Sequence, residues 1–237
     1  MIRVMRRLIA ASALASVLAS TAPAHAEWWA GLYLGLAVTS NTEVTFHTRR
    51  PRTWEGVEVD NSFVWGGRVG YWLERGVFGD MFGDLTPFLG FDVDISYFRP
   101  RIPTQTASSD EGPRRLGAMD LAVGTFTPEL IARYPLMVDN EYPSGRLQPY
   151  VAFGPTIFYS STGDSTTFGP RGSSESDVGV GVSVRPGIAW HVSESVAIFA
   201  EYRFVHLSPT FDFPRGPVDL SINSHQFNFG ATYHFGK

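Results

Sequence analysis

The feature that most constrains this chain is a strict alternation of apolar and polar residues that recurs along its length. In the last such segment, 225–235, Phe227, Phe229 and Tyr233 fall on one face, and Asn228 falls on the other. Because successive side chains of a β-strand point to opposite faces, the pattern predicts a strand with one bulky apolar face and one small polar face.

Eight segments of this kind can be counted, separated by clusters of Gly, Pro, Asp and Ser. Long connections follow the first, third, fifth and seventh segments, whereas Val192–Ser195 alone follows the sixth. Long loops on one rim and shorter turns on the other are typical of an all-β, eight-stranded antiparallel up-and-down transmembrane β-barrel, which is the predicted fold. The segments are approximately Trp29–Val38, Phe63–Leu73, Pro87–Phe98, Gly124–Tyr134, Leu147–Tyr159, Val178–His191, Val196–Leu207 and His225–Phe235.

The first 26 residues have the features of a secretory signal peptide. Three Arg precede an apolar run, 8–19, and the small-residue pattern Ala24-His25-Ala26 follows, so cleavage is expected after Ala26. The run is too short to span a bilayer as a helix. We therefore expect a signal peptide over 1–26 and one barrel domain over 27–237.

Composition limits the kinds of partner and the stabilising interactions that the chain can have. The formal net charge is −4, which argues against nucleic acid, and cysteine is absent, so stability in an oxidising compartment must come from packing and hydrogen bonding. The polar faces carry glycine and arginine, and Lys237 is the single lysine. A solvated protein surface would instead be rich in Lys and Glu, so the polar face is expected to line the barrel interior.

Charged residues of both signs occupy this inner face. Eight strands enclose a lumen just wide enough for side chains to fill, and unpaired charges there would be costly, so four basic and four acidic groups should pair. The predicted lumen ion-pair network contains Arg68, Asp92, Asp94, Glu129, Arg133, Arg185, Glu201 and Arg203.

Several segments together resemble the OmpA-like outer-membrane β-barrel family of Gram-negative bacteria: "YLGLAVT", "GGRVGYWL", "LIARYPL", "QPYVAFGP", "AEYRF" and "FNFGATYHF". The resemblance covers essentially the whole chain after residue 26. It implies a cell outer-membrane location with both termini in the periplasm, contact with outer-membrane lipid and lipopolysaccharide, and insertion by the barrel assembly machinery. Two departures are that the terminal aromatic is Phe235, before a final Gly-Lys, and that no peptidoglycan-binding domain follows the eighth segment.

One pair of residues suggests chemistry. His206 and Ser208 have the spacing of the "HxS" element of outer-membrane lipid A deacylases, and their parity places them on the lipid side at the outer end of a strand. A triad also needs a group that orients the histidine. Pro209 follows Ser208 and no Glu follows Glu201, which leaves only Asp212 or Asp219 if the loop folds back. The catalytic interpretation is therefore the weaker one.

Other candidates are an arginine group and a carboxylate pair. Asp92 and Asp94 could be read as a metal-binding pair, but ion pairing in an Arg-rich lumen accounts for them, so no metal and no cofactor are expected. Seven Arg in or beside the first two long loops could bind lipopolysaccharide phosphates through their planar forks, or could simply be solvated. They are Arg49, Arg50, Arg52, Arg99, Arg101, Arg114 and Arg115.

These observations favour a non-enzymatic outer-membrane barrel that contributes to envelope integrity and presents its loops as a surface antigen or contact site. Two alternatives stay open: a narrow channel for small or apolar solutes, and a lipid A esterase using His206 and Ser208. The sequence does not set the oligomeric state.

Overall fold

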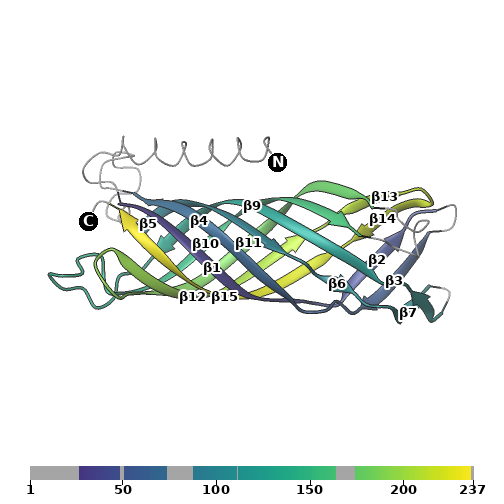
Figure 1. The fold of residues 1–237 in the computed structure, drawn as a ribbon, viewed down its shortest axis with the longest axis horizontal. Coiled ribbons are helices and arrows are strands. Elements are labelled where there is room, and N and C mark those ends of the chain that lie inside the picture. The colour runs from purple at the N-terminus through teal and green to yellow at the C-terminus, as the bar shows by residue number, and fades with distance from the viewer. Residues whose placement is uncertain (1–26, 49–50, 74–87, 111, 164–173, 236–237) are drawn as a thin grey trace, which may run out of the picture.

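Fifteen β-strands are present in the computed structural model, which describes residues 27–48, 51–73, 88–110, 112–163 and 174–235. The predicted signal peptide, Pro87 at the start of the third predicted segment, Arg49 and Arg50 lie outside these residues. Eight long strands form a tilted cylinder (Figure 1). They are β1 (Glu27–Thr39), β4 (Ser62–Trp72), β5 (Leu89–Phe98), β9 (Met119–Arg133), β10 (Leu147–Thr162), β11 (Ser176–His191), β12 (Val196–Leu207) and β15 (Ile222–Phe235).

The cylinder is a closed antiparallel barrel, as predicted. Each long strand pairs with the long strand that follows it, and β15 pairs back to β1, so that Leu34 lies opposite Trp65 on β4 and Phe229 on β15. Closure leaves the barrel without an exposed sheet edge. Within the described residues, no helix has the length and apolar composition to cross a membrane.

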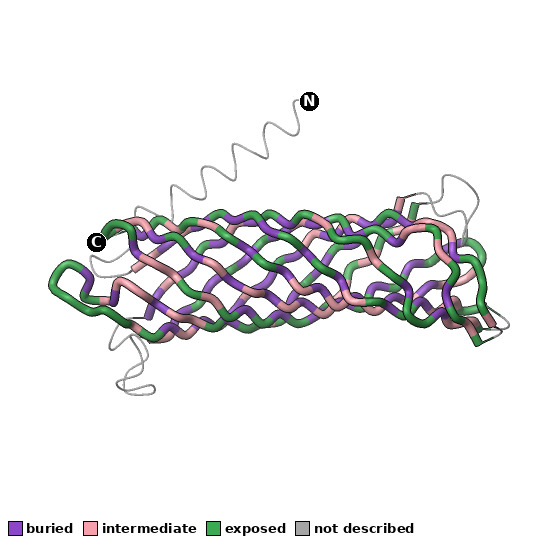
Figure 2. Tube along the Cα trace, turned by 90° about the horizontal axis from the view of Figure 1, so that it is seen from below, coloured by how far each residue is buried: buried purple, intermediate pink, exposed green. Residues whose placement is uncertain are grey.

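Side chains alternate between the two faces along every long strand, as Figure 2 shows in the regular change of burial. Leu32, Phe63 and Val180 point outward with 75%, 79% and 71% of their surface exposed, whereas Arg185 and Arg203 point inward and are fully buried. A barrel with an apolar outside and a polar inside satisfies its backbone internally and presents apolar surface to lipid.

The long loops are more ordered than the sequence suggests. Three of them form hairpins and bridges that extend the barrel at the end opposite Glu27 and Phe235, where β1 begins and β15 ends (Figure 1). We call this end the loop end and the opposite one the terminal end. A six-stranded loop sheet runs in the order β13 (Thr210–Phe213), β14 (Gly216–Leu220), β2 (Thr42–Phe46), β3 (Arg52–Val57), β7 (Gln105–Ser109) and β8 (Arg114–Leu116), and β6 (Arg101–Ile102) pairs with β9.

The interior changes character toward the loop end. On β9 the inward residues Met119, Leu121 and Val123 are buried and apolar, whereas Thr125 and Glu129, further from the loop end, are polar. The apolar face of the strand thus changes from outside to inside where the strand leaves the lipid-facing region. As a result β9 begins at Met119, five residues before the predicted start, and an apolar core joins the barrel mouth to the loop sheet.

Candidate functional site

Seven inward charges form one central network in the middle of the lumen. Each side chain comes from the inward parity of its strand, and each residue is at most 6% exposed. Glycines on the same face provide space: a Cβ on Gly66 would lie 2.4 Å from the Tyr33 hydroxyl, and one on Gly187 would lie 2.5 Å from the Tyr150 ring. The central network consists of Arg68 on β4, Asp92 and Asp94 on β5, Glu129 on β9, Arg185 on β11, and Glu201 and Arg203 on β12.

Arg185 bridges three carboxylates. Its Nη2 donates to Asp92 Oδ2 at 2.7 Å and to Glu129 Oε2 at 2.5 Å, and its Nη1 donates to Glu201 Oε2 at 3.1 Å. Glu201 also accepts two bonds from Arg68, each 2.8 Å, and one from the Tyr150 hydroxyl at 2.6 Å. Arg185 on β11 and Glu201 on β12 are therefore linked across the lumen to four other strands, β4, β5, β9 and β10.

Arg203 binds a second group of acceptors. Its Nη1 donates to Asp94 Oδ1 at 2.6 Å, its Nε donates to Ser183 at 3.0 Å, and its Nη2 donates to Thr127 at 2.9 Å. Tyr33 donates its hydroxyl hydrogen to the same Asp94 oxygen at 2.9 Å. Neutral hydroxyls thus supplement the ion pairs.

Arg133 lies apart from the central network, in contrast to the expectation of eight paired charges. At the terminal end its Nη2 donates to Glu27 Oε2 at 2.8 Å, and its guanidinium lies 4.0 Å from the centre of the Trp72 ring. His234 Nδ1 lies 3.0 Å from the other Glu27 oxygen. The central network therefore pairs three guanidinium groups with four carboxylates. The alternation pattern did not identify Glu27 as inward, because this residue precedes the first predicted segment.

Little space remains in the lumen. A cavity of about 30 Å³ lies between the central network and the terminal-end pair, lined by Arg68, Arg133, Tyr150 and His234 among others. A cavity of this size holds only a few water molecules. On the other side of the network, Phe98, Val205 and Leu207 fill the lumen and are fully buried. Within the described residues, the central network fills the middle of the lumen and apolar side chains fill it toward the loop end.

The predicted His206 and Ser208 lie on the outer face at the loop end of β12. Ser208 Oγ is 3.3 Å from His206 Nε2, and His206 Nδ1 is 2.8 Å from Asn223 Oδ1 on β15. The orienting group judged missing from the sequence is thus present as an amide. Asp219 does not serve, because it contacts His47 at 2.7 Å and Thr210 at 2.8 Å. Asn223 was missed because only the strand register places it opposite His206.

The arginines predicted to contact lipopolysaccharide are distributed over the loop end. Arg99 and Arg101 line one groove of about 420 Å³ together with Phe63, Trp65 and Tyr97. In the remainder of the predicted set, Arg52 lies on β3 and Arg114 and Arg115 lie on β8, while Arg49 and Arg50 are outside the described residues. The structure therefore brings two of the seven together beside aromatic side chains.

No metal centre is evident in the part of the chain that the structure describes. No group of three or more His, Cys, Asp or Glu is placed there to hold an ion. Asp92 and Asp94 instead accept hydrogen bonds from Arg185 and Arg203.

Comparison with known proteins agrees with this architecture. Residues 11–235 match the family described as outer membrane protein beta-barrel domain. The chain belongs to this family. Its location is accordingly the outer membrane, as the resemblance of its sequence segments predicted. No curated protein matches the chain.

Among three solved structures that match the chain, OprG is similar in fold. OprG from Pseudomonas aeruginosa matches with a TM-score of 0.55 at 12% identity, covering 89% of this chain and 96% of OprG. Neisserial surface protein A matches with a TM-score of 0.49 at 13% identity, covering 87% of this chain and 96% of the other. Ail of Yersinia pestis matches with a TM-score of 0.39 at 14% identity, covering 87% and 98% of the two chains.

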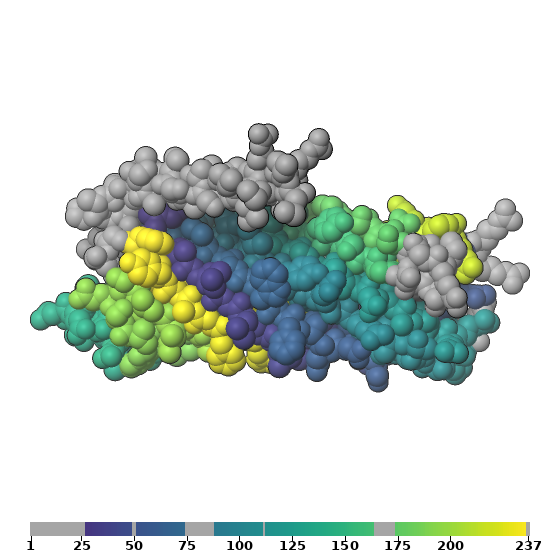
Figure 3. Space-filling model, in the orientation of Figure 1, coloured from purple at the N-terminus to yellow at the C-terminus, as the bar shows by residue number. Residues whose placement is uncertain are grey.

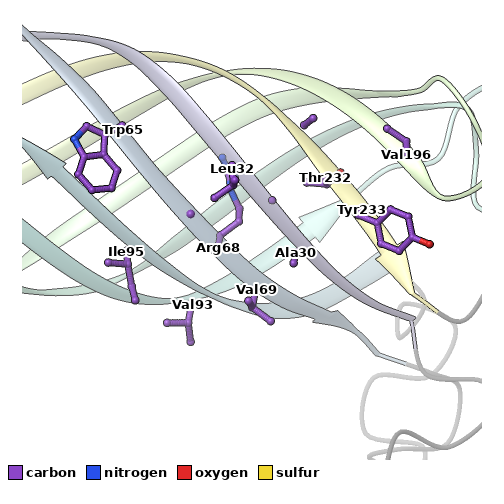
Figure 4. A pocket seen from close by; sticks show the side chains of 13 residues that line it. Ala30, Leu32, Trp65, Arg68, Val69, Val93, Ile95, Val196, Thr232 and Tyr233 are labelled. Carbon is purple, nitrogen blue, oxygen red and sulfur yellow. The ribbon is translucent and has the colours of Figure 1, made fainter. Parts of the chain in front are cut away.

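The outer surface of the barrel carries many exposed apolar side chains, and one hollow in it lies over β1, β4 and β15. Figure 3 shows β15 and β1 side by side on this face. A hollow of about 720 Å³ lies over the small residues Ala30 and Ala231, and Leu32, Trp65 and Tyr233 stand around it (Figure 4). Because it is lined by apolar side chains within the lipid-facing surface, lipid chains can fill it.

Proposed function

We propose that the protein is a sealed outer-membrane barrel that contributes to envelope integrity and presents its loop sheet as an external contact surface. The observation that carries this proposal is the double filling of the lumen, by the central network and by the apolar core that continues into the loop sheet. An eight-stranded barrel filled in this way has its function on its surfaces.

The central network is suited to a structural role. Isolated charges in a buried lumen would cost several kcal/mol each to desolvate, so only paired and hydrogen-bonded groups persist there. Arg185 and Arg203 are fully buried and each bonds to several acceptors. Such a network ties opposite walls of the barrel together and obstructs the passage of solutes, which argues against the channel alternative.

The loop sheet supports the contact role because it is packed against the apolar core. Its inner side chains Val44, Trp54 and Val218 are buried in the apolar core, whereas Glu43 and Glu55 are exposed on the other side. A rigid surface loses less conformational entropy on binding than a flexible loop. The sheet is therefore a suitable platform for recognition outside the cell.

The groove of Arg99 and Arg101 supports contact with lipopolysaccharide. Both guanidinium groups are exposed beside Phe63, Trp65 and Tyr97, and the aromatic rings match the boundary between headgroups and acyl chains. Arg101 Nε lies 3.1 Å from Asp120, so one carboxylate already shares this site. Arginine forks pair with phosphate oxygens in a bidentate manner.

The contact is tested by thermal unfolding in vesicles with and without lipopolysaccharide. The stabilisation by lipopolysaccharide should fall when Arg99 and Arg101 are changed to Gln, and further when the other five predicted Arg are also changed. Arg146→Gln, at the terminal end, is the matched control and should keep the full stabilisation. Equal stabilisation of the seven-fold variant and wild type would refute the contact.

The envelope role is tested in cells. Cells that lack the protein should become more sensitive to sodium dodecyl sulfate, and expression of the wild type should restore resistance. Unchanged sensitivity of the deletion strain would remove the proposed contribution to envelope integrity.

A further inference from the structure

We infer that Ser208, His206 and Asn223, together the rim triad, form a hydrolytic site that cleaves acyl esters of membrane lipids. This activity goes beyond the proposed envelope and contact function. It rests on a chain of two hydrogen bonds, from Ser208 Oγ to His206 Nε2 at 3.3 Å and from His206 Nδ1 to Asn223 Oδ1 at 2.8 Å.

The amide of Asn223 defines the state of the histidine. With the amide oxygen of Asn223 toward His206, as the structure assigns it, that oxygen can only accept, so His206 carries its hydrogen on Nδ1 and donates it to Asn223. The lone pair of Nε2 then faces Ser208, whose hydroxyl donates to it. This is the tautomer that a general base needs, and an amide replaces the carboxylate as orienting group in known triads of the cysteine type. A Ser–His distance somewhat longer than ideal is usual before substrate binds.

The fold sets the alignment of the triad. His206 and Asn223 lie directly opposite each other in the ladder of β12 and β15, and Ser208 follows on the same outward parity as His206. Long barrel strands on either side keep this register. The three side chains therefore come from rigid elements, except that Ser208 lies just beyond the end of β12.

The surroundings indicate the substrate class. Val182 lies opposite His206 on the neighbouring strand β11, and Val180 follows on the same face; both are exposed toward lipid. Phe204 lies on the other side of His206 along β12. An acyl chain can pack on this apolar wall while its ester group lies level with the exposed Ser208. Both phospholipids and the lipid A part of lipopolysaccharide carry such esters.

The reaction is a balanced acyl transfer. Ser208 Oγ attacks the ester carbonyl carbon while His206 Nε2 takes its proton, and the tetrahedral intermediate collapses as His206 returns the proton to the departing lipid hydroxyl. Water, activated by His206 in turn, adds to the acyl-serine and releases a fatty acid. Oxidants, metals and cofactors take no part in these steps.

A second serine–histidine contact on the same rim provides a matched control. Ser40 Oγ lies 3.1 Å from His225 Nε2, and the other ring nitrogen of His225 lies 2.6 Å from the Tyr202 hydroxyl. A tyrosine hydroxyl can donate as well as accept, so His225 lacks the fixed tautomer of His206. Ser40→Ala should therefore leave ester hydrolysis unchanged.

The experiment measures fatty-acid release by mass spectrometry from the full-length protein refolded into two kinds of vesicle. One kind contains phosphatidylethanolamine and phosphatidylglycerol, and the other also contains lipopolysaccharide. Release from the first identifies phospholipid as substrate, and release of lipid A acyl chains from the second alone identifies lipopolysaccharide. Ser208→Ala and His206→Ala should lose at least ~100-fold in rate, as removal of a triad member does. No release from either vesicle overturns the inference.

Covalent labelling separates catalysis from a structural role. A fluorophosphonate probe should modify Ser208 in the wild type and in Ser40→Ala, and it should not modify that site in His206→Ala. Asn223→Asp should retain labelling because a carboxylate accepts the same hydrogen bond, whereas Asn223→Leu should lose it. A shift in gel mobility between unboiled and boiled samples confirms that each variant is folded. Equal labelling of Ser208 in folded wild type and folded His206→Ala would also overturn the inference.

Discussion

Replacing Arg185 by methionine should destabilise the barrel more than any change at an exposed arginine. Methionine keeps much of the side-chain volume but removes the charge that Asp92, Glu129 and Glu201 share. These carboxylates stay buried, with Arg68 and Arg203 as the remaining guanidinium groups of the central network.

The size of the effect follows from this geometry. Removing one partner of a buried ion pair costs about 3–5 kcal/mol, because the remaining charge is buried without compensation. Arg185 compensates three carboxylates at distances between 2.5 and 3.1 Å, so a loss in the upper part of that range is expected. Adding Glu129→Gln to Arg185→Met removes one uncompensated charge and should restore about 0.5–3 kcal/mol, the usual range of coupling between contacting residues.

The assay is equilibrium unfolding by urea in phospholipid vesicles, followed by tryptophan fluorescence. Arg99→Met is the control, because Arg99 is exposed at the rim and its replacement in vesicles without lipopolysaccharide should change the free energy of unfolding by less than about 0.5 kcal/mol. If Arg185→Met lost less than about 1 kcal/mol, the network would not be the stabilising element inferred from its contacts.

Three further changes test the packing of the lumen, the apolar core and the loop sheet by the same unfolding assay. Gly66→Ala should lower the free energy of unfolding by about 1–3 kcal/mol through overpacking, because the new Cβ would lie 2.4 Å from the Tyr33 hydroxyl. Gly124→Ala is the control and should be close to neutral, because the nearest atom to its Cβ would be 4.0 Å away. Equal effects of the two changes would contradict the packing described for Gly66. Phe158→Ala should cost about 3–5 kcal/mol, since Phe158 is buried in the apolar core, and a loss below that range would mean that the core is loosely packed. His47→Gln should cost less than about 1 kcal/mol, because its carboxylate partner is about half exposed and solvent screens the pair; a larger loss would show that the loop sheet depends on it.

The barrel was predictable because alternation specifies strands and parity specifies faces. Phe227 and Phe229 point outward and Asn228 inward, as the pattern indicates. The loop sheet was not predictable in the same way. Toward the loop end the apolar residues move to the inner face, as Leu121 and Val123 show, so a search for one constant apolar face ends the strand too early.

Which side chains contact each other, inside or outside the barrel, depends on their position along the barrel axis as well as on parity. Parity identified Arg133 as inward, but the stagger of the strands places it at the terminal end beside Glu27 and not in the central network. Likewise Asn223 became the partner of His206 through the register of β12 and β15. Neither stagger nor register can be read from a single strand segment, which is why these two contacts required the structure.

Ionic conductance of the folded protein in planar lipid bilayers tests the central claim, a sealed lumen, most directly. The wild type, shown to be folded by its gel mobility before boiling, should give no stable openings, because the central network and the apolar core fill the lumen in the described residues. Reproducible openings of the wild type, abolished or altered by Arg203→Gln, would contradict the sealed barrel and favour a channel.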